Sequence, residues 1–239
     1  MTKASRAELR AELVGRIPAW YSPWAHLAFP TLAGIAIAAF AIGRIHGLAA
    51  WQLLSVPAFL VLGNAIEWHA HRGLLHRRVR FLEVLYVRHT PQHHAIFVSD
   101  DMAMRDAREL KLVLLPAYGI LAILVVTSPV TATLVWVGQP NLAALWVVCV
   151  VIYVLSYEWL HLAYHLPPES WLGRTRALAI LRRHHQLHHA THLMHRWNFN
   201  VTVPLWDYVR GTVYRPGQTP AEGLARRASR RVTRRRPTR

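Results

Sequence analysis

Histidine is the residue type in this sequence whose abundance and spacing point to chemistry. The chain has 16 histidines, and 14 of them lie between His69 and His195. Twelve of the 14 form four groups: "HAHRGLLH" at 69–76, "HTPQHH" at 89–94, "HLAYH" at 161–165 and "HHQLHH" at 184–189. Protonated rings this close together would repel one another, whereas a divalent cation keeps neutral rings bound to it. The sequence therefore predicts a metal-binding site.

Spacing predicts which histidines share a helix face. Residues three or four apart stack on one side of an α-helix, so His161 and His165 are expected to point the same way. His185 is expected to share a face with His188 and His189 for the same reason. Each such set can present two nitrogens to one ion, or to two ions that lie close together.

The first two groups are spaced differently. His71 and His76 are five residues apart, about 140° around an α-helix, so we expect each to serve a different ion of a pair. His89 and His93 share a helix face from which His94 is displaced, which again suits two ions. The histidines in these patterns number ten, more than one ion can bind, which favours a dinuclear centre.

The segments between the histidine groups are apolar enough to cross a membrane. Hydrophobic residues make up 53% of the chain. Residues 112–157 include no charged side chain, and Arg44 is the only one in 26–66. About 20 apolar residues span the ~30 Å hydrocarbon core of a bilayer. The sequence therefore predicts an all-α integral membrane protein with four transmembrane helices in two hairpins, near 26–43, 48–67, 112–137 and 142–160.

The flanking segments predict the domain organisation and the orientation. Residues 1–25 are expected to be an N-terminal cytosolic or interfacial segment, 26–215 the membrane domain, and 216–239 a disordered Arg-rich tail. Positive charge concentrates in the N-terminus, the 69–111 connection and the C-terminal third, which places these parts in the cytoplasm. All four histidine groups then meet in a cytosolic helical cap. The Arg and Ala bias suggests a bacterial inner (cytoplasmic) membrane.

The residues around the histidines resemble the fatty acid hydroxylase superfamily of integral membrane non-haem di-iron enzymes, which includes sterol desaturases. The matching segments are "EWHAHRGLLH", "RHTPQHH", "YEWLHLAYH" and "RRHHQLHHATHLMHRWNFNVTVPLWDYVRGT". They extend in the family's order from about Glu67 to Thr212. Asn200 stands where the family usually has glycine. Asp207, in "PLWD", is expected to be a structural cap or turn residue.

The resemblance implies a ligand set and its cofactors. The family pattern carries over to ten histidines: His71, His76, His89, His93, His94, His161, His165, His185, His188 and His189. They would bind two iron ions, with zinc as an alternative occupant of the purified protein, and O₂ would be the co-substrate. Glu67, Glu158, His69 and His184 are candidates for outer positions that orient the ligands.

The same resemblance implies O₂-dependent oxidation of a lipid C–H bond, with hydroxylation favoured over desaturation. Electrons would come from a separate partner such as a cytochrome b5, a ferredoxin or a flavoprotein reductase. The alternatives are a metal transporter and a non-catalytic metal- or lipid-binding membrane protein. Transport is disfavoured because 112–157 offers no ionisable group at mid-membrane depth. Nucleic acid is not an expected partner, because the Arg-rich tail lacks interleaved aromatic residues.

Overall fold

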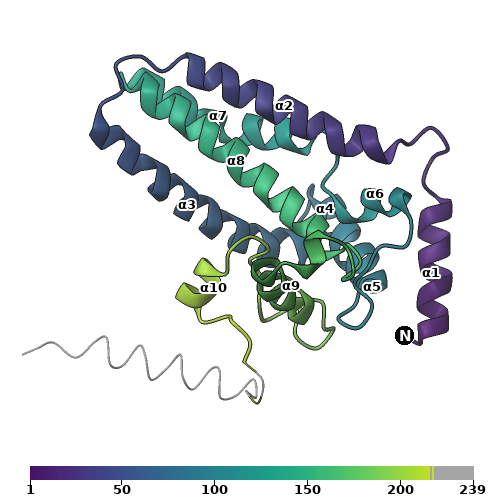
Figure 1. Cartoon of the computed structure of the whole chain (residues 1–239). Coiled ribbons are helices and arrows are strands. Elements are labelled where there is room, and N and C mark those ends of the chain that lie inside the picture. The colour runs from purple at the N-terminus through teal and green to yellow at the C-terminus, as the bar shows by residue number, and fades with distance from the viewer. Residues whose placement is uncertain (216, 218–239) are drawn as a thin grey trace, which may run out of the picture.

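Four long helices form the body of the protein in a computed structural model that describes residues 1–215 and 217 (Figure 1). Over these residues every regular element is a helix. The predicted tail lies outside the described residues except for Gly217. The four helices are α2 (Pro23–Gly43), α3 (Ser55–Ala70), α7 (Gly119–Trp136) and α8 (Pro140–Tyr164). Each is long and apolar enough to cross a membrane, α3 together with the turns at its two ends, which confirms the prediction of an all-α membrane protein.

The long helices are arranged as two hairpins around α8. Helix α8 packs against α2, α3 and α7. The turn between α2 and α3 is fastened to α8 by Asn141, whose side chain hydrogen-bonds to the backbone of His46 at 3.1 and 2.8 Å. Gly138, with a φ of 73°, ends the second hairpin turn just before Pro140 begins α8. Helices α3 and α8 therefore both end at the same side of the molecule.

The third long helix starts later than the sequence predicted. The expected span began at 112, whereas α7 begins at Gly119. Residues Leu110–Val113 instead form a separate short helix, α6, and Leu114 is extended. The reason is Pro116, which disfavours helical backbone at the residue before it and has no N–H to donate. The segment between α6 and α7 thereby belongs to the cap and contributes to the site.

Short helices form the cap at the end where α3 and α8 finish (Figure 1). They are α4 (Glu83–Val87), α5 (His94–Ile96), α6, α9 (Arg176–His188) and α10 (Leu205–Arg210). Two π-helical turns join them to their neighbours: η2 (His71–Leu75) continues α3, and η3 (Arg88–His93) connects α4 to α5. The histidines of the four groups lie in these cap elements, directly beside them, or in the last turns of α3 and α8.

The N-terminal helix α1 (Lys3–Gly15) is packed against the cap. Thr2 caps it by accepting the N–H of Ser5 at 3.1 Å. Its Leu13 is buried in an apolar core with Ile96 and Leu162, which belong to α5 and α8. Part of the predicted 1–25 segment is thus built into the protein core.

The contact between α3 and α8 gives a test of the packing. A Cβ at Gly63 would lie 2.8 Å from Cδ2 of Tyr153. The Tyr153 hydroxyl donates to Glu67 and lies 2.7 Å from Oγ1 of Thr202, so the ring cannot move without losing these bonds. We expect Gly63→Ala to lower the free energy of unfolding by about 1–3 kcal/mol.

The measurement is thermal unfolding in detergent. Gly43→Ala is the matched control, because a Cβ there meets no atom within 4 Å. Equal unfolding temperatures for Gly63→Ala and the control would contradict the close packing of α3 on α8.

Candidate metal centre

The structure gathers ten histidines into two adjacent clusters of five. Cluster 1 consists of His71, His76, His89, His94 and His188, and cluster 2 of His93, His161, His165, His185 and His189. Within each cluster one ring nitrogen from every histidine lies within 4.8 Å of the others. All ten side chains are buried, none more than 7% exposed. These are the ten positions to which the family pattern carries over.

A π-helical turn explains how the first histidine group enters cluster 1. The sequence assumed an α-helix, in which His71 and His76 would point apart. In a π-helical turn the hydrogen bond runs between residues five apart, so these residues lie above one another. The two rings are stacked, with centroids 5.1 Å apart and planes 16° from parallel. Both therefore join cluster 1, and the expectation that each serves a different ion is wrong.

A second π-helical turn reverses the expected pairing in the next group. His89 shares cluster 1 with His94 and not with His93, and the Nε2 atoms of His89 and His94 are 3.0 Å apart. His93 turns away into cluster 2. Pro91 lies inside this turn and has no N–H, so the α-helical hydrogen bond from this position cannot form. The widened turn thus distributes one short group over both clusters.

Adjacent histidines are divided between the clusters. Of the pair His93 and His94, the first belongs to cluster 2 and the second to cluster 1; of the pair His188 and His189, the first belongs to cluster 1 and the second to cluster 2. The rings of His94 and His189 stack across the boundary with centroids 4.1 Å apart. The two clusters consequently share a wall of imidazole rings.

The α-helical sets behave as their spacing predicted, and the set on α9 serves both clusters. His161 and His165 both face cluster 2 at the end of α8. On α9, His185 and His189 meet in cluster 2 with Nε2 atoms 2.9 Å apart. His188, three residues after His185, goes to cluster 1 instead. Helix α9 therefore contributes to both clusters from one stretch of chain.

Backbone carbonyls fix the tautomer of five of the rings. The Nδ1 atoms of these rings lie beside carbonyl oxygens: His71 with Phe199 at 2.5 Å, His93 with Leu112 at 2.9 Å, His165 with Met102 at 2.8 Å, His188 with Trp197 at 2.8 Å and His189 with Phe97 at 2.5 Å. A carbonyl can only accept, so Nδ1 carries the proton. Each Nε2 then presents a lone pair to the cluster, as a metal ligand must.

One pair of ring nitrogens in cluster 1 shows that the residues fit a cation. Thr90 donates its hydroxyl to the Leu75 carbonyl at 2.7 Å, so its oxygen accepts from Nδ1 of His76 at 3.2 Å. The Nε2 atoms of His76 and His188 are therefore both lone pairs, 2.9 Å apart. Two nitrogens bound at right angles to one ion, with bonds of about 2.0–2.1 Å, lie about 2.9 Å apart. Among the described residues, Nε2 of His165 is likewise buried without a hydrogen-bond partner.

Burial keeps the rings of the cap neutral. Burial is the main cause that holds the pKa well below the ordinary value of 6.5 in His89, His93, His94, His165, His185, His188 and His189. Neighbouring histidines lower the pKa further, because a second positive charge nearby is unfavourable. Neutral rings are the form that binds metal.

The two candidate outer carboxylates bond to groups other than imidazole. Glu67 accepts from the backbone N–H of Val201, from the N–H of Thr202 at 3.1 Å, and from the hydroxyls of Thr202 and Tyr153. Glu158 accepts from the N–H of Leu115 at 3.2 Å. Glu67 thus joins α3 to α8 and the 201–202 segment, and Glu158 joins the chain before α7 to α8.

The two candidate outer histidines have different surroundings. His69 is exposed and lies edge-on to Trp68, with ring centroids 4.8 Å apart. His184 places its Nε2 3.0 Å from Oδ2 of Asp207. Neither belongs to one of the clusters. His184 therefore contributes to the support of the site through Asp207.

Asp207 organises the chain that supports cluster 1. This fully buried carboxylate accepts from the backbone N–H of Phe199 at 3.0 Å and of Asn200 at 2.8 Å. It also accepts from Nε1 of Trp68 at 3.1 Å and from the hydroxyl of Thr212. The loop it fixes supplies the carbonyls that hold two cluster 1 ligands. The structural role expected for Asp207 agrees with these contacts.

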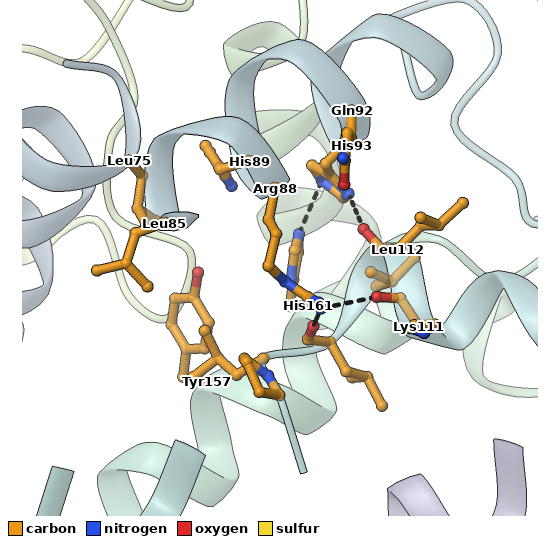
Figure 2. A pocket seen from close by; sticks show the side chains of 14 residues that line it. Leu75, Leu85, Arg88, His89, Gln92, His93, Lys111, Leu112, Tyr157 and His161 are labelled. Atoms are coloured by element: carbon orange, nitrogen blue, oxygen red, sulfur yellow. Dashed lines mark hydrogen bonds between the residues drawn. The ribbon is translucent and has the colours of Figure 1, made fainter. Parts of the chain in front are cut away.

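Sequence reasoning missed the pocket beside the clusters. Its apolar lining comes from Leu75, Leu85 and residues 112–116, and it touches His89 of cluster 1 and both His93 and His161 of cluster 2 (Figure 2). Arg88 lies along it and donates to the Lys111 carbonyl at 2.9 Å. The segment between α6 and α7 forms part of its wall, and the sequence analysis had assigned that segment to a continuous membrane span.

Two substitutions test whether each cluster holds its own ion. We expect wild-type protein to bind two transition-metal ions per chain, and His188→Ala in cluster 1 or His165→Ala in cluster 2 to reduce this to about one. Metal content measured by plasma mass spectrometry after gentle extraction gives the count. His192→Ala is the control, because His192 is exposed and lies in neither cluster. Loss of both ions from either variant would contradict two separate sites.

Acid should destabilise the metal-free protein. The pKa of the cap histidines is lowered in the folded state, so below their ordinary pKa of 6.5 the unfolded chain binds more protons. Stability is then full above that value and falls as pH decreases through it. Thermal unfolding of chelator-treated protein from about pH 8 to about pH 5 should show a falling midpoint. A midpoint independent of pH would contradict burial of neutral rings.

Comparisons with known proteins agree with this geometry. The family model described as fatty acid hydroxylase matches residues 56–212, more than half of the chain and all ten clustered histidines. No curated protein and no solved structure matched the chain. A match of this extent shows that the chain belongs to the fatty acid hydroxylase family, a family of membrane-embedded oxidoreductases that act on lipids.

Proposed function

We propose that this protein hydroxylates a C–H bond of a lipid with O₂, at two iron ions bound by the ten clustered histidines. The observation that carries the proposal is one pocket in contact with both clusters, each made of five buried imidazoles. Family membership supports the oxidation of lipid. Desaturation is the second reaction that the same centre could support.

Iron ions bound there would supply the redox chemistry that activates O₂ toward an unreactive C–H bond. In the net reaction one oxygen atom enters the C–H bond and the other leaves as water, consuming two electrons and two protons. An external donor must provide the electrons; a cytochrome b5, a ferredoxin and a flavoprotein reductase are the candidate classes.

The protein's own residues position the substrate and exclude water. The pocket walls are formed by apolar side chains, including Leu75, Leu85, Val113 and Leu115, with Tyr157 beside them. A hydrocarbon chain in this pocket would lie against ligands of both clusters. Five carbonyl-held rings keep their Nε2 atoms directed inward throughout. Such fixed ligand geometry is what controlled oxidation of one carbon requires.

The arrangement of apolar and basic segments supports a membrane orientation. The clusters lie at the end where α3 and α8 finish, next to the cap that carries the Arg-rich loops (Figure 1). We infer that this side faces the cytoplasm, since short positively charged segments stay on that side. We further propose that the membrane is the cytoplasmic membrane of a bacterium, which the Arg and Ala bias of the sequence supports, with the pocket open to lipid from its inner leaflet.

A lipid-oxidation assay tests the function. Iron-loaded protein in nanodiscs, supplied with O₂ and a reducing system, should convert a lipid of the host extract into a product heavier by one oxygen atom, seen by mass spectrometry. Isotopic O₂ should label that atom. His188→Ala should abolish the product, because removing a ligand disables cluster 1, whereas the exposed His192→Ala should retain it.

Other outcomes decide between the remaining readings. A product lighter by two hydrogens would identify a desaturase. Fully iron-loaded protein that yields no O₂- and reductant-dependent product, while His188→Ala leaves folding and lipid association unchanged, would contradict an enzyme and favour a non-catalytic binding protein. Movement of metal across sealed vesicles would identify a transporter.

A further inference from the structure

Residues 97–109 supply backbone groups that hold two ligands of cluster 2. The Phe97 carbonyl accepts from Nδ1 of His189 at 2.5 Å, and the Met102 carbonyl from Nδ1 of His165 at 2.8 Å. The N–H of Met104 also donates to the backbone carbonyl of His165, at 2.8 Å. Two of the five cluster 2 rings are therefore oriented by this segment, which is largely without regular structure.

Arg10 of α1 holds this segment in place. Its side chain is buried, and its Nη2 donates to the Ala103 carbonyl at 2.9 Å and to Oε2 of Glu109 at 3.1 Å. Its Nε lies 3.0 Å from Oε1 of the same carboxylate, which is itself buried. The planar guanidinium thus connects the middle and the C-terminal end of the segment to one point on α1, a geometry that lysine cannot reproduce.

Further contacts of Arg10 reach the residue that orients His189. The guanidinium lies 4.9 Å from the centre of the Phe97 ring, a cation–π contact, and Nη1 is 3.7 Å from Oδ1 of Asp101. Leu13, one turn along α1, packs in the same apolar core as Phe97. The segment therefore contacts α1 through Phe97, Asp101 and Ala103, and it contacts cluster 2 through the carbonyls of Phe97 and Met102.

The carbonyls that orient two cluster 1 rings are held without α1, although α1 packs against α5, which carries the cluster 1 ligand His94. The carbonyls that hold His71 and His188 belong to Phe199 and Trp197, in the loop that Asp207 fixes. Helix α1 packs against α5 and lies apart from α10, which carries Asp207 (Figure 1). It also precedes residue 56, where the family match begins, so the match assigns it no role.

We propose that α1 is a positioning element for cluster 2, and that Arg10 is the residue through which it acts. Arg10 touches no ligand ring; it holds the carbonyls of Phe97 and Met102 where His189 and His165 need them. The inference rests on the proposed function in one respect, namely that His165 and His189 bind a metal ion. Loss of Arg10 should weaken the ion at cluster 2 and leave the ion at cluster 1 in place.

Hydrogen exchange of the metal-free protein tests the structural step without any bound ion. In Arg10→Ala we expect the amides of 97–104, that of Met104 included, to exchange at least about tenfold faster, since one partner of a buried charge pair is lost. The 197–201 loop beside cluster 1 should be unchanged. Arg16→Ala is the matched control on the same helix, because Arg16 is exposed and pairs only with Glu12 among the described residues.

Metal binding tests the consequence for the site. We expect Arg10→Ala to bind the ion at cluster 2 about 10- to 100-fold more weakly than wild type. This is the usual loss of metal affinity when a group that orients a ligand is removed. Adding His165→Ala should cause little further loss, whereas adding His188→Ala should remove the remaining ion. Arg10→Lys should lie between wild type and Arg10→Ala.

A second variant covers the case in which Arg10→Ala fails to fold. Arg10→Met combined with Glu109→Gln removes both charges of the buried pair while keeping their volume, which spares the protein an unpaired buried charge. It should fold and show the same selective loss. The proposal would be overturned if the Arg10 variants showed the same amide hydrogen exchange and metal affinity as wild type. It would also be overturned if they lost metal equally from both clusters. Wild-type protein without two ions would instead contradict the proposed function, and the exchange result would still decide the role of Arg10.

Discussion

The structure depends on packing ten neutral imidazoles in a buried volume with their lone pairs directed at one another. Lone pairs 2.9 Å apart with no proton between them, as at His76 and His188, repel unless a cation lies between them. In five of the rings a backbone carbonyl accepts a hydrogen bond from Nδ1–H and so keeps the proton on that nitrogen, and these rings cannot relieve the repulsion by changing tautomer. A pair of metal ions satisfies this arrangement, and dense histidine with a single buried cysteine leaves imidazole as the ligand type.

Much of the cap exists to hold those carbonyls. Four of the five come from irregular segments, because carbonyls inside a helix are used by its own hydrogen bonds. The fifth, that of Leu112, belongs to the four-residue helix α6, where the last carbonyls have no helical partner. Irregular chain must itself be fixed, and two buried charged side chains do this. Asp207 fixes the 197–200 loop for cluster 1, and Arg10 fixes the 97–109 segment for cluster 2. The metal centre thus has one anionic and one cationic support, each far in sequence from most ligands it serves.

The sequence was sufficient for the four long helices and for the candidate histidines, since uniform apolarity and residue spacing are local properties. It was insufficient where geometry departs from a regular α-helix. The π-helical turns at 71–75 and 88–93 determine which histidines share a cluster. As a result His71 and His76 lie in the same cluster, whereas His89 and His93 lie in different ones. The start of α7 at Gly119 and the packing of α1 by Arg10 depend on contacts with distant chain. Helical periodicity alone contains no information about either.

Anomalous X-ray scattering from crystals of the metal-loaded protein, recorded at the absorption edge of the bound element, tests the central claim most directly. The account requires two peaks in adjacent positions. The first should be surrounded by Nε2 atoms of cluster 1 and the second by those of cluster 2, at about 2.0–2.2 Å. A single peak, no peak, or peaks bound by exposed residues such as His192 would contradict it.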